Sequence, residues 1–142
     1  MSVITDIAEA VKEDLNAGSF SQPFTAERHY QPLFELKDMK TLKVSVVPNG
    51  ITVNPLGRGQ NQYDVKIDVA VMKKFSKDDA AELDPLMLLV EEIADHFRLK
   101  RLAGYAGAMW IRTENVPVYA QEHMEQLRQF TSVLTFTFRM QR

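Results

Sequence analysis

The run from Phe130 to Met140 limits the possible folds more than any other feature of the sequence. From Leu134 to Met140 every second residue is large and apolar, and the residues between them are two threonines and an arginine. This period of two is typical of a strand with one buried face. We therefore expect a sheet that is covered on one side.

Size and composition predict one globular domain spanning residues 1–142. The chain is long enough for one core, and 45% of its residues are hydrophobic and 25% charged. The net charge of -2, spread in both signs, offers no basic field for holding DNA. The absence of cysteine excludes disulfides, thiolate zinc sites and a cysteine nucleophile.

Targeting signals are not apparent in the sequence. The first residues have neither a basic segment nor a long apolar one, as a secretory signal would require. The longest mostly apolar stretch, Leu86 to Val90, is far shorter than the ~20 residues of a membrane span. We expect a soluble protein that is assembled in the cytoplasm and does not bind membranes.

Two helices are predicted from apolar residues at helical spacing. The first covers residues 3–17 and stops at Gly18. The second has Asp84 as its N-cap and Pro85 at its first position, and it continues toward Gly104. Arg98, Lys100 and Arg101 are then expected to close it, in keeping with the helix dipole.

Strands account for much of the remaining sequence. Residues 63–71 give the clearest alternation, with Asp64, Lys66 and Asp68 on the polar face. Residues 42–46 and 51–53 flank the turn-forming Pro48-Asn49-Gly50, which predicts a hairpin or an interrupted strand. The weaker expectations are an edge or bent strand at 26–36, a mobile loop at 54–62, a short strand at 109–111, an extended segment at 115–119 and a helical turn at 121–129.

The order of these elements predicts the fold class. One helix, several strands, a second helix and a final strand indicate an α+β fold, with a mostly antiparallel sheet and two main helices packed on one face.

One enzymatic alternative rests on Asp64, Lys66 and Asp68. Asp-x-Lys on a strand is half of the motif of metal-dependent nucleases, in which carboxylates hold magnesium and lysine steadies the attacking water. The pattern is common by chance, and no Pro-Asp partner precedes it at a strand end. A polar strand face facing solvent is the simpler interpretation.

Other chemical motifs are weaker. Glu92 and His96 lie four residues apart on the second helix, but a solvated helix face explains them better than a metal site. Gly57-Arg58-Gly59 matches no phosphate-binding motif, and no serine has a nucleophile-elbow sequence around it. We therefore predict a protein that is not an enzyme and uses no cofactor or metal.

Trp110 and Tyr119 lie in the least regular part of the sequence. Aromatic residues on such segments are common in protein interfaces, and they also close the ends of cores. Both interpretations stay open for this pair.

Five segments together resemble the tail terminator type of neck and tail-completion proteins of tailed bacteriophages, over nearly the whole chain. They are Ile4-Thr-Asp-Ile-Ala-Glu-Ala-Val, Phe24-Thr-Ala-Glu-Arg-His-Tyr, Phe34-Glu-Leu-Lys-Asp-Met-Lys-Thr-Leu-Lys-Val, Leu89-Val-Glu-Glu-Ile-Ala-Asp-His-Phe and Leu127-Arg-Gln-Phe-Thr-Ser-Val-Leu-Thr-Phe-Thr-Phe. The resemblance is one of overall pattern, with no catalytic motif.

The resemblance implies a structural virion protein that forms a hexameric ring at the head–tail neck. Such a ring caps the tail tube, contacts the tube and connector proteins, and lets DNA through without binding it specifically. Asp64, Lys66 and Asp68 are candidates for the ring lumen. The candidate interface residues are Pro32, Leu56, Arg58, Gln60, Asn61, Trp110 and Tyr119. A head-side connector protein, the nuclease and a monomeric binding domain are the alternatives.

Overall fold

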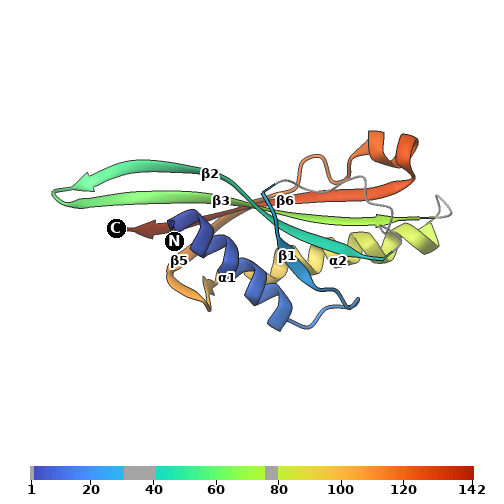
Figure 1. Cartoon of the computed structure of the whole chain (residues 1–142), viewed down its shortest axis with the longest axis horizontal. Helices are drawn as coiled ribbons and strands as arrows, with labels where there is room; N and C mark the ends of the chain where they lie inside the picture. The colour runs from blue at the N-terminus through green and yellow to red at the C-terminus, as the bar shows by residue number, and fades with distance from the viewer. Residues whose placement is uncertain (1, 31–40, 76–79) are drawn as a thin grey trace.

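The computed structural model describes residues 2–30, 41–75 and 80–142 and shows one six-stranded sheet with helices packed on it (Figure 1). The strands lie in the order β1-β2-β3-β6-β5-β4, and among these pairs β1 and β2 are parallel while the others are antiparallel. The predicted α+β class is confirmed. The elements are α1 (Val3–Ala17), β1 (Ala26–Arg28), β2 (Lys43–Gly57), β3 (Gln60–Lys74), α2 (Ala80–Phe97), β4 (Arg101–Leu102), β5 (Tyr105–Glu114), the π-helix η1 (His123–Leu127) and β6 (Gln129–Gln141).

The core lies between one face of the sheet and the two long helices. The apolar residues of β3 and β6 that were predicted to share a face are buried, except for Tyr63, which is partly buried, and Ile67 and Phe136 pair directly across the two strands. On the helices, Ile7, Val11, Leu89 and Ile93 are almost fully buried in the same cluster. Period two in the strands and period 3.6 in the helices therefore place these apolar side chains in one core.

The opposite face of the sheet, here called the open face, is polar only in part. Asp64, Lys66 and Asp68 are half-buried there. Farther along β3, Ala70 and Met72 on the same face are fully buried, with Val133 of β6 packed against them. The expectation of one covered and one wet face thus holds for the middle of β3 and not for its C-terminal end.

Helix α1 has the predicted bounds. Its N-cap is Ser2, whose Oγ accepts a hydrogen bond from the backbone N–H of Thr5 at 3.2 Å. The helix ends at Gly18, where a Cβ atom would lie 2.8 Å from the ring of Phe20. The close approach of this ring requires glycine at this position. The backbone angles of Gly18 do not require it, because they are ordinary extended ones.

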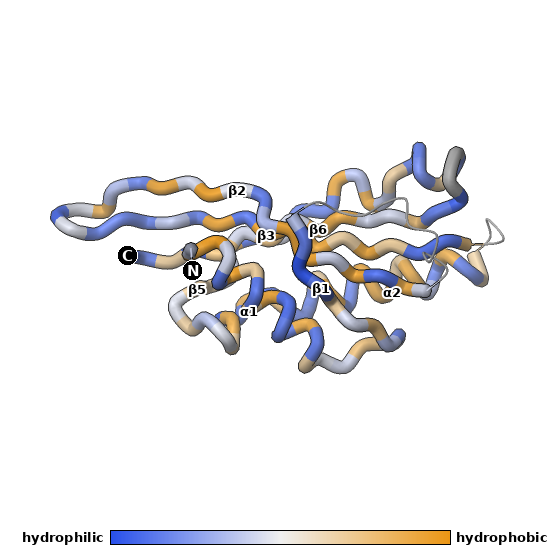
Figure 2. The backbone as a smooth tube through the Cα atoms, in the orientation of Figure 1, coloured by the Kyte–Doolittle hydropathy of each residue, from blue (hydrophilic) through white to orange (hydrophobic). Residues whose placement is uncertain are grey.

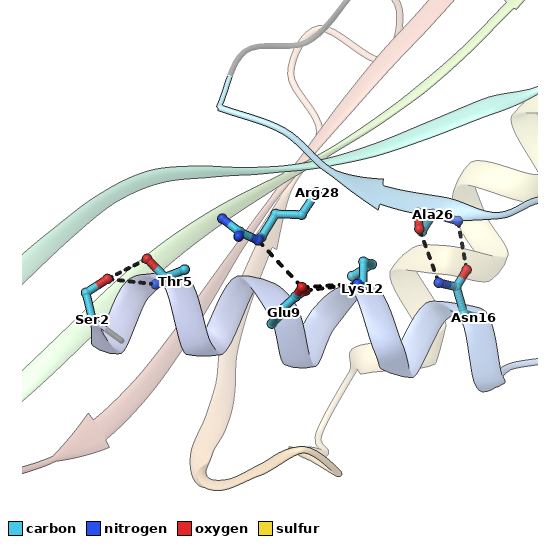
Figure 3. A network of polar contacts seen from close by, with 7 residues as sticks. All are labelled: Ser2, Thr5, Glu9, Lys12, Asn16, Ala26 and Arg28. Carbon is cyan, nitrogen blue, oxygen red and sulfur yellow. Dashed lines mark hydrogen bonds and ion pairs between the residues drawn. The ribbon is translucent and has the colours of Figure 1, made fainter.

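A row of polar residues on α1 holds the edge strand β1 in place (Figure 3). The Asn16 side chain accepts from the backbone N–H of Ala26 at 2.7 Å and donates to the Ala26 carbonyl at 3.1 Å. About two turns before Asn16 on α1, the Glu9 carboxylate lies 3.0 Å from the Lys12 ammonium and 3.8 Å from the Arg28 guanidinium. A three-residue strand has few backbone bonds of its own, so these side chains fix its position.

Replacing Asn16 by alanine is expected to destabilise the protein by roughly 1–3 kcal/mol, because the buried N–H of Ala26 loses its partner. Chemical denaturation would measure the loss, and hydrogen exchange at Ala26 would locate it. Lys12→Ala is the matched control on the same helix face, since a partly exposed ion pair contributes ~0–1 kcal/mol. Equal stability of wild type and Asn16→Ala would contradict the assigned role.

Helix α2 differs from its prediction at both ends. It already includes Ala80, so Asp84 is not its N-cap and Pro85 lies inside it. It ends at Phe97, and Arg101 belongs to β4, where it donates to the carbonyl of Ala106 at 3.2 Å. Proline removes one backbone hydrogen bond of a helix, and near the start of a helix this loss is small enough for the helix to continue upstream of it. The Asp84-Pro85 pattern therefore predicted the start of α2 at least one turn too late.

The largest correction concerns residues 48–62. Pro48-Asn49-Gly50 forms an irregularity within β2, so the interrupted strand is confirmed and the hairpin turn at this point is wrong. The predicted mobile loop at 54–62 is also wrong, because β2 and β3 pair up to Gly57 and Gln60 and reverse at Arg58-Gly59. Gly57 and Gly59 adopt φ angles of 147° and 76°, which other residues rarely reach.

The remaining elements follow the predictions in outline. β5 is longer than the predicted 109–111, and the helical turn expected at 121–129 is present, with η1 as its main part. Of the edge strand expected at 26–36, residues 26–28 are strand, and residues 31–36, including Pro32, lie outside the described residues.

Candidate assembly surface

The paired ends of β2 and β3 form an arm that extends beyond the helices (Figure 1). We call residues 48–63 the arm. Its inner strand β3 is flanked on the other side by β6, and Asn61 and Arg142 exchange two backbone hydrogen bonds of 2.8 and 2.9 Å. β6 therefore follows β3 almost to the tip of the arm, and three adjacent strands hold the arm in an extended shape.

The outer edge of the arm has no partner strand among the residues that the structure describes. β1 pairs with β2 no farther than Val46, whose carbonyl accepts from the N–H of His29 at 2.9 Å. Within residues 2–30, 41–75 and 80–142, no strand pairs with β2 on this side beyond that point. Unpaired strand edges readily bind another strand.

Apolar side chains on the arm are exposed. Ile51, Val53 and Leu56 show 44%, 47% and 47% of their surface, and Figure 2 shows hydrophobic segments on β2 out along the arm. Ile51 lies opposite Val65, and Val53 opposite Tyr63. Side chains of this kind on a projecting strand pair are typical of a contact surface.

Polar contacts on the open face connect neighbouring strands. Arg139 donates to both carboxylate oxygens of Asp64, at 2.8 and 3.2 Å, and these bonds hold the pKa of Asp64 below its ordinary value despite partial burial. Asp68 accepts from Thr135 at 2.7 Å and from Asn49 at 3.0 Å. Both carboxylates are therefore engaged by side chains of the sheet itself.

The nuclease alternative gains no support from this geometry. Asp64 and Asp68 are four residues apart on β3, which separates their backbones by about 13 Å and is too far for both carboxylates to bind one metal ion at about 2.0–2.6 Å. Among the described residues, no group of three or more histidine or acidic side chains could hold a metal ion.

Replacing Asp64 by asparagine is expected to lower stability at pH 7 and to lose that effect in acid. The folded-state pKa of Asp64 is depressed, so its contribution is complete above its unfolded pKa of about 3.9 and disappears as pH falls through the folded value. Urea unfolding of both proteins between pH 7 and pH 2.5 measures the difference. Asp95→Asn on the exposed surface of α2 is the control. A constant gap between wild type and Asp64→Asn at every pH would contradict this assignment.

A cavity of about 280 Å³ lies at the far end of the molecule from the tip of the arm (Figure 1). It lies between the first half of α2 and the segment before and at the start of β6. Tyr119 lies at its wall, 6.4 Å from the ring of Phe130, and among the described lining residues Asp84 is the charged one. The lining residues are Ala80, Leu83, Asp84, Met87, Tyr119, Met124 and Phe130.

The candidate interface residues are thus spread over different regions. Leu56, Arg58, Gln60 and Asn61 lie together at the end of the arm, and Tyr119 lines the cavity. Trp110 is partly buried against the core, and its indole N–H donates to Thr113 at 2.8 Å. Pro32 lies outside the described residues.

Several residues of these surfaces were missed from the sequence. Ile51 and Val53 were assigned to a short strand but not to an interface, although their alternation with Thr52 and Asn54 indicates an arm strand. The cavity has no local signal, because it joins residues about 40 positions apart.

Glu92 and His96 have structural partners, contrary to the expected solvated face. Glu92 accepts from the backbone N–H and hydroxyl of Ser21, at 3.1 and 2.6 Å. The His96 ring lies 3.1 Å from the Asp14 carboxylate and contacts Phe20 and Phe97. These contacts join α2 to α1 and to the loop that follows α1.

Comparison with known proteins gives similarity at the level of structure. No protein-family model and no curated protein matches the chain. Among solved structures, the chain is similar to the sheath/tube terminator in the cryo-EM structure of an extracellular contractile injection system, PVC, in its extended state. The TM-score is 0.45 at 17% identity, over 96% of this chain and 56% of that chain. The chain therefore spans just over half the length of that protein.

Within the described residues, the helices are too short or too polar to cross a bilayer.

Proposed function

We propose that the protein is a structural subunit of a ring that caps the tail tube at the neck of a tailed phage-like particle. This is the role implied by the resemblance of the sequence to tail terminators. The observation that carries the proposal is the arm, which combines a strand edge that is unpaired within the described ranges with the exposed side chains of Ile51, Val53 and Leu56.

Closed rings need two different patches on each subunit. A head-to-tail contact between copies closes when the rotation from one copy to the next completes a circle, as in a hexamer. The arm at one end of this chain and the cavity at the other form such a pair of unlike patches (Figure 1). Each copy would use its arm on one neighbour and its cavity on the other.

The open face suits a channel that carries DNA without holding it. Asp64 and Asp68 present negative charge there, and Lys66 and Arg139 balance it. A surface of mixed sign gives no continuous positive path along a phosphate backbone. We propose that this face lines the lumen and that the ring rims contact the tail tube protein and the head–tail connector proteins. The protein would then be a virion component that acts without catalysis.

Ring formation is tested by the solution mass of the purified protein. Light scattering over a concentration series should give a hexamer, or a monomer that shifts toward a hexamer as concentration rises. Addition of purified tail tube should recruit the protein to tube ends and stop further tube growth. A monomer at every concentration that also fails to bind tube ends would contradict the proposed function.

A further inference from the structure

We propose that the tip of the arm inserts into the cavity of the next copy, with Leu56 inside the cavity and Arg58 paired with Asp84 at its rim. This inference rests on the proposed ring and assigns the partner of each patch. The occupant of the cavity is thus a second copy of the same chain.

The first argument is chemical complementarity. The cavity is lined by Leu83, Met87, Met124 and two aromatic rings, so an apolar side chain suits it. Leu56 is the large apolar residue next to the turn, and nearly half of it is exposed. A volume of about 280 Å³ exceeds the roughly 150 Å³ that accommodates a benzene molecule in a protein interior, so a leucine side chain fits.

The second argument is charge. Residues 54–62 contain one charged side chain, Arg58, which is exposed at the turn between β2 and β3. Asp84 is exposed on α2, and it is the charged residue among those that line the cavity in the described part of the chain. A guanidinium next to a carboxylate at the edge of an apolar contact sets its orientation and disfavours other arrangements.

The third argument is position. The tip of the arm and the cavity lie at opposite ends of the longest axis of the molecule (Figure 1), so the arm cannot reach the cavity of its own chain. Contact between them joins different copies head to tail, and each copy has one arm and one cavity. The cavity is therefore completed by a residue of the neighbouring copy.

Cysteine trapping tests the contact directly, since the protein has no cysteine of its own. The variant carrying both Arg58→Cys and Asp84→Cys should form, under mild oxidation, a ladder of disulfide-linked oligomers that a reducing agent dissolves. Each single variant alone should give no ladder, and a mixture of the two should give linked pairs. Equal, low cross-linking in all samples would overturn the proposed contact.

Charge exchange gives an independent readout without cysteine. Arg58→Asp and Asp84→Arg should each raise the concentration needed for assembly at least about tenfold, because like charges then meet at the contact. Mixing the two variants should restore assembly, since every contact in an alternating oligomer again joins opposite charges. Both positions are exposed, so melting temperatures should match that of the wild type.

The outcomes separate this inference from the proposed function. A ring that forms normally in both charge variants and is not trapped by the cysteines would overturn the inference and leave the ring intact. A protein that neither forms a ring nor reaches tube ends, and shows no cross-linking, would overturn both.

Discussion

Replacing Phe136 by alanine is expected to lower the free energy of unfolding by roughly 3–5 kcal/mol, a large part of the total for a domain of this size. Phe136 is fully buried on the helix-covered face of β6, where its ring lies 4.9 Å from that of Phe97 on α2. It also stacks on Phe138 at 6.3 Å. The substitution leaves a cavity where the sheet and α2 meet, and neighbouring rings cannot close it without leaving their own contacts.

Equilibrium denaturation measures this loss. Leu88→Ala is the matched control, because Leu88 lies on the outer side of α2 with half its surface exposed, and a change there should stay within about 0.5 kcal/mol. A loss below about 1 kcal/mol for Phe136→Ala would show that the contact between β6 and α2 is not part of the central core.

Replacing both Ile51 and Val53 by threonine is expected to weaken ring assembly by about a hundredfold while leaving the folded subunit intact. Both side chains are largely exposed in the single chain, so folding does not depend on burying them. In an assembled ring, the loss of these apolar contacts would make the free energy of association less favourable by roughly 2–3 kcal/mol for the two positions together. Threonine suits a strand, so the arm should keep its shape.

Light scattering and thermal unfolding of the same samples separate assembly from folding. Met109→Thr is the control, because Met109 is a strand residue with similar exposure that lies outside the arm. Wild-type assembly of the Ile51→Thr, Val53→Thr variant would show that these two side chains do not form a contact between copies. A large drop in its melting temperature would instead place these side chains in the fold of the single subunit.

Much of the core could be predicted from local patterns. Alternation along β3 and β6 identifies Val65, Ile67, Phe136 and Phe138 as buried, because a strand places neighbouring residues on opposite faces wherever it lies. The same holds for α1, whose apolar stripe and flanking Ser2 and Gly18 mark its bounds.

The candidate site was predicted less completely than the core. Leu56 and Arg58 were chosen as candidates from the sequence, but as parts of a loop, and Tyr119 was chosen without its cavity. Gly57-Arg58-Gly59 holds the signal for a tight reversal between two strands. The turn signal at Pro48-Asn49-Gly50 is stronger, and the sequence analysis therefore considered the hairpin turn there. Local sequence does not determine which of two possible turns connects a pair of strands.

The amino-acid sequence by itself determined which residues face the core, the α+β class and the course of α1, because these depend on periodicities within one element. The tertiary structure decided the rest. Continuous pairing with β3 carries β2 through Pro48 and builds the arm, and α2 extends upstream of Pro85. The cavity exists because α2 and the segment before β6 meet in space. Backbone pairing and contact between distant segments outweigh the local preferences of a few residues, and these long-range interactions place the arm and the cavity at opposite ends of the molecule.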